Sequence, residues 1–533
     1  MENEATPEAA LKPALSNRTY WLTRFVLLRL LGAIYAIAFW VAVQQILPLI
    51  GSNGLTPVGD YLQQVSAAFG SDTAGFMRLP SVFWFGHSDG ALLAVAWIGF
   101  VLSLVVVAGY ANAPLITFIW MLYMSFVHVG QEWYGYGWEY QLSETGFLAI
   151  FLCPLVDMRP FPKKPPPFPI VLLFRWLACR SMLGAGLIKL RGDEIWRNST
   201  ALYYHFETKP IPGPLSRWFH FLPRTVLKIG VWFNWLAEIV APLFVFWPRV
   251  ARLAAGVVII LFQFNILISG NLSFLNWLTI VPALACFDDA FWAKLLPKAL
   301  VRKAAAAEEG AVESPAMVNT AWIVLGLIAF LSFQPVVNLF SPGQVMNSSY
   351  DPLDLVNTYG AFGTVGKERL NVVFEGTEDA DSSNSVRWKP YRYKGLPVLL
   401  NQRPPQVAPY QLRFDWQMWF ASMATPYEYP WTVQLVAKLL QNDPLAVQLF
   451  ADNPFPHKPP RFIRAVLYRY SFAQPGNREG RYWNRKKLNT WLPAMSLQSV
   501  QLFGQPANLP TQPMEEVIIK TKAKKPEKKD SLR

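Results

Sequence analysis

Residues 24–47 read RFVLLRLLGAIYAIAFWVAVQQIL and form the first of several long apolar runs. A helix needs about 20 predominantly apolar residues to cross the hydrocarbon core of a bilayer, so this run is long enough to span a membrane. The residues before it are polar, and no small-residue cleavage site follows it. We therefore expect the run to be retained as a membrane helix rather than removed as a signal peptide.

Eight further apolar runs follow, and together they predict a polytopic α-helical membrane bundle. The composition agrees, because 53% of the residues are hydrophobic and 16% are charged, against about 25% charged in soluble domains. Some runs are short, so the expected number of helices is about nine. The predicted membrane helices cover 24–47, 90–110, 113–130, 140–157, 168–189, 226–247, 250–269, 272–288 and 318–338.

A domain of mixed α and β structure is predicted after the last apolar run, where the composition becomes that of a soluble protein. Residues 369–376, 386–393 and 462–472 have the β-branched and aromatic content of strands. Residues 411–423 and 431–450 have the apolar spacing of helices, with a break at Pro444. The predicted divisions are a cytoplasmic segment at 1–23, the bundle at 24–288, a cytoplasmic linker at 289–317, the final membrane helix at 318–338, an exported α+β domain at 341–510 and a basic tail at 511–533.

The distribution of Lys and Arg predicts which side of the membrane each segment occupies. Basic residues gather in alternate segments, as expected if short cytoplasmic loops carry the positive charge. With a cytoplasmic N-terminus and an odd number of helices, the α+β domain lies outside the cytoplasm. The loop 190–225 breaks the pattern, and a site that uses cations would explain its charge. The basic residues of the expected cytoplasmic segments are Lys12, Arg18, Arg159, Lys163, Lys164, Arg249, Lys294, Lys298, Arg302 and Lys303.

The net charge of +13 does not indicate a nucleic-acid partner, because much of it lies in short loops between apolar runs and in the lysine-rich tail. Cys153, Cys179 and Cys286 lie in or beside apolar runs, so we expect small buried side chains. The sequence has no CxxC, HExxH, GxSxG, Walker A or GxGxxG motif, and it predicts neither a metal site nor a cofactor. The alternative to a protein without a cofactor is one that binds a quinone or a lipid.

The stretch RSMLGAGLIKLRGDEIWRNSTALYYHFETKP at 180–210 carries the strongest indication of a site. It begins as an apolar helix but includes Arg180 and Lys189, although an ionised side chain at mid-membrane costs about 2.5–3.5 kcal/mol on insertion scales. Arg180 and Glu238 fall near the middle of antiparallel helices, so we expect an intramembrane ion pair between them. Such a pair either fixes the register of the helices or contacts a substrate.

Polar residues at the outer ends of the helices, together with the loop 190–225, predict an outward-facing pocket around Lys189. A lysine held near hydrocarbon can act as a base or nucleophile, whereas a structural lysine there extends its ammonium group to the interface. If the chain is an enzyme, the expected catalytic residues are Lys189, His205 and Glu207. The other residues expected at the pocket are His128, Glu132, Arg180, Arg191, Asp193, Trp196, Glu238, Asn265, Asn271 and Asn276.

Trp416 and Trp419 lie in the aromatic segment DWQMWFAS at 415–422, which has two interpretations. As part of a core helix, the segment needs no further function. If the two indoles are exposed, they are the expected client-binding residues, because aromatic side chains carry much of the energy of protein interfaces.

Many long segments, in one order, resemble the lipase maturation factor family of membrane proteins. This resemblance implies a chaperone-like factor whose soluble domain engages an exported client such as a lipase. The family is found in the endoplasmic-reticulum membrane and has bacterial relatives. The expected soluble domain here has no cysteine, which argues against handling of client disulfides. The matching segments include YWLTRFVLLRLLGAIYAIAF (20–39), MLGAGLIKLRGD (182–193), HFETKPIPGP (205–214), LVNTYGAFGTVGKER (355–369), RFDWQMWFA (413–421) and NPFPHKPPRFIR (453–464).

Helices five to eight of the predicted bundle also resemble part of vitamin K-dependent γ-carboxylase, in which a lysine acts on the quinol cofactor. Lys189, Asp193 and Trp196 match one segment, and NLSFLNW at 271–277 resembles a later one. The leading hypothesis is a bacterial inner-membrane maturation factor for an exported protein, or an endoplasmic-reticulum protein if the source is eukaryotic. The alternative is an integral-membrane enzyme that acts on a lipid or quinone.

Overall fold

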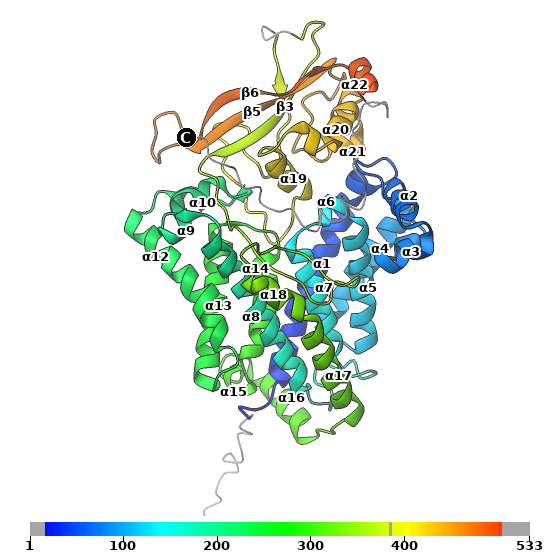
Figure 1. The fold of residues 1–533 in the computed structure, drawn as a ribbon, viewed down its shortest axis with the longest axis vertical. Helices are drawn as coiled ribbons and strands as arrows, with labels where there is room; N and C mark the ends of the chain where they lie inside the picture. Colours follow the sequence, from blue (N-terminus) through cyan, green and yellow to red (C-terminus); the bar gives the residue numbers. More distant parts are fainter. Residues whose placement is uncertain (1–15, 383–385, 504–533) are drawn as a thin grey trace, which may run out of the picture.

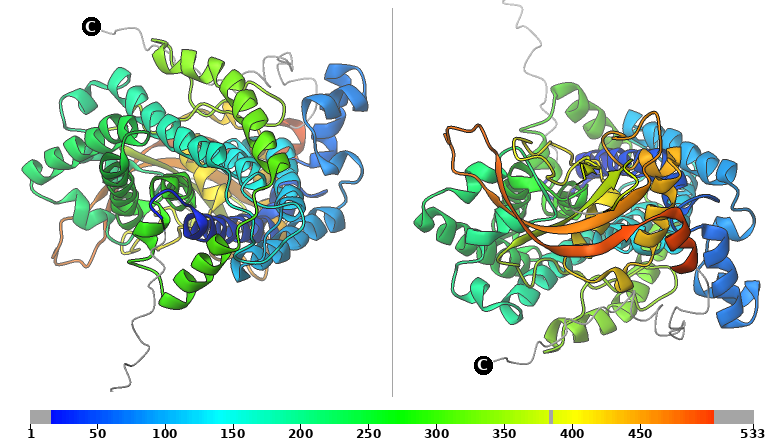
Figure 2. Two further views of the ribbon diagram at one scale, coloured as in Figure 1. Left: turned by 90° about the horizontal axis from the view of Figure 1, so that it is seen from below. Right: turned by 90° about the horizontal axis from the view of Figure 1, so that it is seen from above.

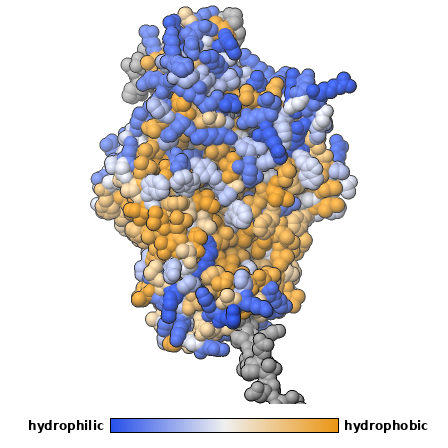
Figure 3. Space-filling view, turned by 180° about the vertical axis from the view of Figure 1, so that it is seen from behind, coloured by the Kyte–Doolittle hydropathy of each residue, from blue (hydrophilic) through white to orange (hydrophobic). Residues whose placement is uncertain are grey.

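The computed structural model describes residues 16–382 and 386–503 as a helical bundle with an α+β domain on one end (Figure 1). The predicted tail 511–533 and residues 1–15 of the predicted N-terminal segment lie outside the described residues. On the face that Figure 3 presents, a hydrophobic band crosses the bundle between two hydrophilic ends. Such a band is the surface that a bilayer covers.

Each of the nine runs predicted to cross the membrane contains a helix. Among the described residues, six helices are long and apolar enough to cross a bilayer by length and composition. These six are α1 (Trp21–Ile50), α4 (Asp89–Ala108), α8 (Phe168–Arg191), α12 (Arg224–Trp235) with its continuation to Phe244, α13 (Arg249–Ser269) and α17 (Pro315–Leu331) with α18 (Phe333–Phe340).

The three remaining helices are shorter, so the expected count of nine membrane helices is not confirmed. α5 (Ala113–Val129) has 17 residues. α7 (Gly137–Ile150) ends before Pro154, and the residue that precedes a proline disfavours the helical conformation. α14 (Leu275–Ala283) contains Pro282 and passes into a 3-10 turn at Leu284–Cys286.

Short elements connect the long helices at both ends of the bundle. The loop predicted at 190–225 contains three short helices and β1, which pairs antiparallel with β2. α15 and α16 lie at the end of the bundle remote from the α+β domain (Figure 1). The short elements are α2 (Val58–Phe69), α3 (Asp72–Arg78), α6 (Gln131–Tyr134), α9 (Glu194–Arg197), α10 (Leu202–Thr208), β1 (Ile211–Pro212), α11 (Ser216–His220), β2 (Gly270–Asn271), α15 (Asp289–Trp292) and α16 (Lys298–Glu309).

α1 packs closely along α4. Gly32 of α1 lies against Val106, and Gly99 of α4 lies against the ring of Phe39, with no room for a methyl group at either glycine. Small residues at helix contacts let backbones approach, and this packing is what holds membrane helices together.

The start of α1 is fixed at the end of the bundle that carries α15. The carboxylate of Asp289 accepts hydrogen bonds from the backbone N–H groups of Trp21 and Leu22, at 2.8 and 2.7 Å. A carboxylate is favourable at the start of a helix, where backbone N–H groups have no partners within the helix. The start of α1 and the α+β domain therefore lie at opposite ends of the molecule (Figure 1).

α12 does not continue as a regular helix through the predicted span 226–247. It passes into a π-helical turn at Leu236–Val240 and then a 3-10 turn at Ala241–Phe244. Pro242 has no backbone N–H to donate, and such a loss commonly accompanies an irregular turn. The π turn packs against α8 and brings Glu238 beside Gly186.

The α+β domain is built on a four-stranded antiparallel sheet in the order β4-β3-β5-β6. The predicted helix 431–450 divides into α20 and α21, and the predicted strand 386–393 shortens to β4. α19 packs against β3 and α20 against β5, and the view from above shows the long strands lying across the end of the bundle (Figure 2). The elements are β3 (Arg369–Thr377), β4 (Lys389–Pro390), α19 (Arg413–Ala421), α20 (Trp431–Leu440), α21 (Pro444–Val447), β5 (Phe462–Phe472), β6 (Trp483–Met495) and α22 (Leu497–Phe503).

Candidate functional site

Lys189, in the last turn of α8, forms a buried ion pair with Glu238 of the π turn. Its Nζ lies 2.6 and 2.7 Å from the two carboxylate oxygens and 3.1 Å from Oδ1 of Asn234. Trp196 completes the surroundings, with Nζ 5.1 Å from the centre of its ring. The expected ion pair between Arg180 and Glu238 is therefore wrong, since Lys189 takes the carboxylate.

The error comes from the depth of Glu238 in the bundle. The π turn faces Gly186, which is near the C-terminal end of α8, rather than the middle of that helix. Arg180 lies nine residues before Lys189, which separates the two by about 13 Å along a helix that rises 1.5 Å per residue. One carboxylate cannot bind both cations.

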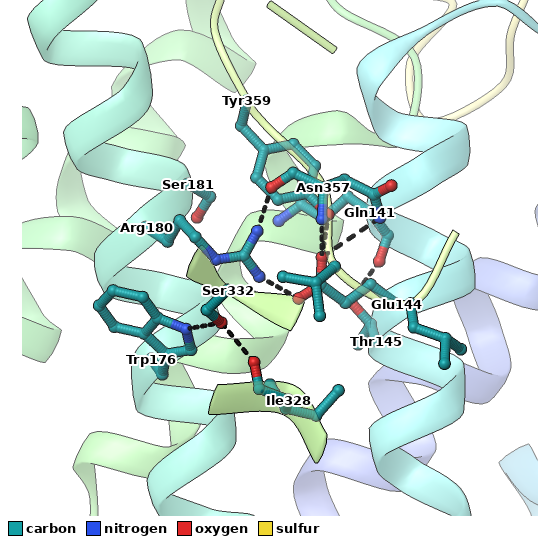
Figure 4. Close-up of polar contacts among 12 residues, drawn as sticks. Gln141, Glu144, Thr145, Trp176, Arg180, Ser181, Ile328, Ser332, Asn357 and Tyr359 are labelled. Carbon is teal, nitrogen blue, oxygen red and sulfur yellow. Dashed lines mark hydrogen bonds and ion pairs between the residues drawn. The ribbon is translucent and has the colours of Figure 1, made fainter. Parts of the chain in front are cut away.

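Arg180 instead lies at the centre of a second buried cluster, shown in Figure 4. Its guanidinium donates to the carboxylate of Glu144 on α7 and to the backbone carbonyl of Asn357. The other oxygen of Glu144 accepts from the hydroxyl of Tyr359 at 2.6 Å and from the backbone N–H of Asn357 at 3.2 Å. The cluster thus joins α7 and α8 to the chain that leads into the α+β domain.

The chain between α18 and β3 fills the place where the sequence predicted a pocket. We call residues 344–363 the connecting segment. Gly184 lies directly against the carbonyl of Tyr359, and the backbone N–H of Asp193 donates to the carbonyl of Gly363 at 2.9 Å. These contacts leave the connecting segment embedded between the outer ends of α7 and α8.

Several residues expected to bind a ligand bind this segment. His128 Nε2 lies 3.3 Å from a carboxylate oxygen of Asp354. Arg191 donates to the side chain of Gln344 at 2.6 Å, and the indole of Trp196 donates to the carbonyl of Phe362 at 2.8 Å. These predicted polar residues are therefore close together, but they bind the connecting segment rather than a separate ligand.

The other expected pocket residues are placed separately and do not converge. Asn271 binds the α+β domain, where it donates to the carbonyl of Pro405 at 2.8 Å. Asn276 donates to Gln263 at 2.7 Å inside the bundle, and Asn265 is exposed on α13. Glu132 is half-buried in α6, and its backbone carbonyl accepts from the side chain of Gln417. The prediction that these residues line one pocket is wrong, because they serve three different contacts.

A third buried ion pair joins the bundle to α19. Arg413 donates to Glu139 of α7 at 2.8 Å and to the carbonyl of Trp133 at 2.6 Å. Burial opposes the charge on Arg413, but the nearby groups of Glu139 and Tyr134 prevail and raise its pKa above the ordinary value. Gln45 of α1 accepts from the backbone N–H of Arg413 at 3.0 Å.

The interpretation of Trp416 and Trp419 as exposed client anchors is wrong. Trp416 is 4% exposed, and its ring lies 4.9 Å from that of Trp138 and 5.7 Å from that of Tyr136. Trp419 is half-buried and donates to the carbonyl of Thr208 at 3.1 Å. Both indoles face the bundle, because α19 lies between the sheet and the membrane helices.

The loop residues His205 and Glu207 are likewise held by structural contacts. Glu207 accepts from the backbone N–H of Phe472 at 2.7 Å, and burial raises its pKa. Burial, followed by the charges of Lys209 and Lys189, lowers the pKa of His205 well below its ordinary value. In the part of the chain that the structure describes, no hydrogen bond or ion pair joins either side chain to Lys189, whose three polar contacts are to Asn234 and Glu238.

Lys209 is a further buried cation that the sequence did not single out. Its Nζ donates to the carbonyl of Ser269 at 2.7 Å, and burial lowers its pKa to about 7. Arg369 of β3 donates to the carbonyls of Lys209 and Pro210, at 2.6 and 3.0 Å. This part of the loop is therefore a contact between the bundle and the sheet.

The contacts of Lys189 are those of a buried ion pair. Three oxygen acceptors surround Nζ within 3.1 Å, which matches the three donors of an ammonium group. Within the described residues, no group of three or more His, Cys, Asp or Glu side chains is arranged to hold a metal ion. All three cysteines are buried as free thiols.

Sequence reasoning missed the acidic partners of two of these ion pairs, Glu139 and Glu144. Glu144 lies in the predicted run 140–157, and Glu139 lies just before it. A charge in hydrocarbon is as costly for these two carboxylates as for Arg180, so the same argument could have identified them. Arg413, which pairs with Glu139, and Asn357, which also binds Glu144, are more than 200 residues away in sequence, and no local pattern connects them. Arg180, the cation that pairs with Glu144, is 36 residues away.

Comparison with known proteins finds similarity to one family along nearly the whole chain. The model of the lipase maturation factor transmembrane domain matches residues 22–294, and that of the lipase maturation factor C-terminal domain matches residues 355–493. No solved structure matches the chain.

Three relatives illustrate the range of similarity. Lipase maturation factor 1 of Bos taurus is 44% identical over 515 residues, which cover 92% of each chain. Lipase maturation factor 1 of Homo sapiens is 41% identical over 94% of each chain. Lipase maturation factor 2 of Homo sapiens is 28% identical over 89% of this chain and 83% of its own. From the two domain matches and these full-length similarities, it follows that the chain belongs to the lipase maturation factor family.

Proposed function

We propose that this chain promotes the maturation of a lipase as a membrane-bound, chaperone-like factor. The observation that carries the proposal is the 44% identity to lipase maturation factor 1 of Bos taurus over 92% of both chains. The site geometry supports it, because Lys189 is held in an ion pair and the polar residues around it bind the connecting segment.

We further propose that the α+β domain lies outside the cytoplasm, where it meets its client. Support comes from the position of the α1 start, which lies at the opposite end of the molecule beside α15 and α16 (Figure 1). The basic residues Lys163, Lys298 and Arg302 belong to that same end, as expected for the cytoplasmic side. Crossings by the shorter helices α5, α7 and α14 would make the total odd.

The membrane in question is the endoplasmic reticulum if the source is a eukaryote. The relatives named above are vertebrate proteins, so they give no support to the bacterial inner membrane or to a bacterial member of the family. They also give none to the γ-carboxylase resemblance.

The bundle at 24–288 and the described part of the α+β domain, residues 341–503, act, in this proposal, as one rigid unit. The reasons are the buried ion pair Arg413–Glu139, the hydrogen bonds that Arg180 and Glu144 make to Asn357, and the embedded connecting segment. A client then binds the surface of the α+β domain turned away from the bundle, since the surface that carries Trp416 is covered.

The test is a gain of lipase activity in cells that lack their own maturation factor. A secreted lipase is expressed with and without the chain, and lipase activity is divided by the secreted lipase mass. We expect the chain to raise this specific activity and to leave a secreted phosphatase unchanged. No change in the lipase, or an equal gain for both enzymes, would contradict the proposal.

A matched variant separates the chaperone from an enzyme that uses Lys189. Lys189→Met combined with Glu238→Leu removes both charges and keeps similar side-chain volumes. If the pair is structural, the double variant at normal membrane levels still matures the lipase. Loss of maturation by a folded double variant would instead assign chemistry to Lys189. A reporter active only outside the cytoplasm, fused to the C-terminus, tests the orientation.

A further inference from the structure

A large crevice opens in the bundle near α16, far from the connecting segment and the α+β domain. It has a volume of about 1000 Å³ and lies between the start of α5, the start of α17 and the loop that joins α7 to α8. The wall toward the bundle is apolar and includes Phe118, Met121, Ile150 and Met317. This volume is at the upper end of what small-molecule sites occupy.

The mouth of the crevice is basic. Arg159, Lys163 and Lys164 line it together with a single acidic residue, Asp157. Arg159 and Asp157 neutralise each other in an ion pair of 2.6 Å. Within the described residues, neither Lys163 nor Lys164 has a carboxylate in ion-pair range, so the mouth keeps two uncompensated positive charges.

Lys163 and Lys164 lie on a loop whose backbone is fixed by hydrogen bonds to other parts of the chain. The backbone carbonyl of Lys163 accepts from the N–H of Val312 at 2.9 Å, and that of Lys164 accepts from Arg24 at 2.9 Å. The sequence FPKKPPP at 161–167 encloses the pair between prolines, whose fixed φ angles restrict the backbone further. The backbone is therefore anchored, and the ammonium groups are left for another partner.

The rim of the crevice is apolar and exposed. Leu155 and Val156 line it and are 71% and 80% exposed. Exposed side chains of this kind next to lysines are typical of the membrane interface, where the apolar groups enter the bilayer and the cations remain at the headgroups.

We propose that this crevice binds one anionic glycerophospholipid, with acyl chain in the apolar part and phosphate at Lys163 and Lys164. Basic pockets between membrane helices on the cytoplasmic side bind anionic headgroups, whereas a soluble anion would gain nothing from an apolar interior. α17 forms one wall and leads through α18 to the connecting segment. The lipid thus braces the helix that carries the α+β domain.

The test is lipid retention by the purified full chain in native mass spectrometry. Phosphatidylserine and phosphatidylcholine with identical acyl chains are added separately to the detergent-solubilised protein. We expect one phosphatidylserine to be retained roughly tenfold more tightly than phosphatidylcholine. The variant Lys163→Gln with Lys164→Gln should lose this preference, and its phosphatidylserine should no longer raise the unfolding temperature.

The matched control is Lys298→Gln with Lys303→Gln on α16. It makes the same change in charge at exposed positions at the same end of the bundle, outside the crevice, and it should keep the preference. Ala316→Trp fills the crevice without changing charge, so it should reduce retention of both lipids.

Three results would overturn the proposal. The first is equal retention of the two lipids by the unchanged protein. The second is a preference for phosphatidylserine that survives Lys163→Gln with Lys164→Gln. The third is displacement of the lipid by millimolar inorganic phosphate alone, which would make the crevice mouth a site for the free anion.

Discussion

Arg413→Met should loosen the α+β domain from the bundle, and the structure gives the size of the effect. Arg413 and Glu139 are 1% and 0% exposed, and 2.8 Å separates their charged atoms. Removal of one partner leaves the other charge buried and uncompensated, at a cost of about 3–5 kcal/mol. Methionine keeps most of the side-chain volume, so the lost charge is the main change.

The double variant Arg413→Met with Glu139→Gln identifies the origin of the loss. The glutamine amide introduced on α7 is neutral, so no buried charge remains without a partner, and the stability should return most of the way. We therefore expect the double variant to be more stable than Arg413→Met alone, with a coupling between the sites of about 2–3 kcal/mol. The unfolding temperature of the detergent-solubilised protein and the rate of proteolysis between bundle and domain report the effect.

The exposed pair Arg469–Glu368 provides a matched control in the same domain. Its side chains are 38% and 54% exposed, with 2.5 Å between the charged atoms. Exposed ion pairs contribute about 0–1 kcal/mol, so Arg469→Met should hardly change the unfolding temperature. Equal effects of Arg413→Met and Arg469→Met, or strictly additive effects of the two changes in the Arg413–Glu139 cycle, would refute the reasoning.

Other contacts in the structure lead to three more predictions. Lys189→Met should lower the unfolding temperature more than Lys189→Met with Glu238→Leu, because the single change strands a buried carboxylate at about 3–5 kcal/mol; the reverse order would show that the pair contributes nothing. Trp416→Ala should cost about 3–5 kcal/mol and reduce membrane levels, whereas the half-buried Trp419→Ala should cost less; if a folded Trp416→Ala protein only lost its client, the buried position would be contradicted. Burial raises the pKa of Asp415 from 3.8 to about 7, so the folded domain binds this proton more tightly than the unfolded chain does. The stability that this group contributes is therefore complete below about pH 4 and is lost as the pH rises toward 7. Asp415→Asn should make the unfolding temperature depend less on pH between about pH 4 and 7, which thermal unfolding at a series of pH values measures.

The membrane helices were predictable because hydrophobic length is a local property. All nine apolar runs contain helices, but among the described residues only six of these helices are long and apolar enough to cross a bilayer. The runs at 113–130, 140–157 and 272–288 contain the shorter helices α5, α7 and α14, and Pro154 and Pro282 limit the last two. The predicted strand 462–472 coincides with β5. The predicted strand 386–393, all of which the structure describes, contains only β4, because Lys389 and Pro390 alone pair in register with β3, and the chain beyond them adds to β3 a single backbone hydrogen bond, from Tyr391 to the carbonyl of Phe374. β6 was missed, since its exposed polar residues, such as Arg485 to Asn489, lack the alternation of a half-buried strand.

The pairing of charges was not predictable from one sequence. Lys189 and Arg180 were correctly identified as unusual residues, because a charge among apolar residues needs a partner. Which partner each one finds depends on the π turn before Pro242 and on the insertion of residues 344–363. Both are outcomes of tertiary packing, and the same long-range packing buries Trp416.

The position of Glu139 and Glu144 sets an order of events during synthesis. Their partners Arg413 and Asn357 leave the ribosome more than 200 residues later. At 5–20 residues per second, the roughly 270 residues from Glu139 to Arg413 take about 15–55 s to translate. Glu144 gains its cation Arg180 after only 36 residues, but throughout the longer interval Glu139 lacks its cation and must remain hydrated, protonated or shielded by the insertion machinery. The proposed maturation factor would therefore itself depend on protection of its unfinished membrane half.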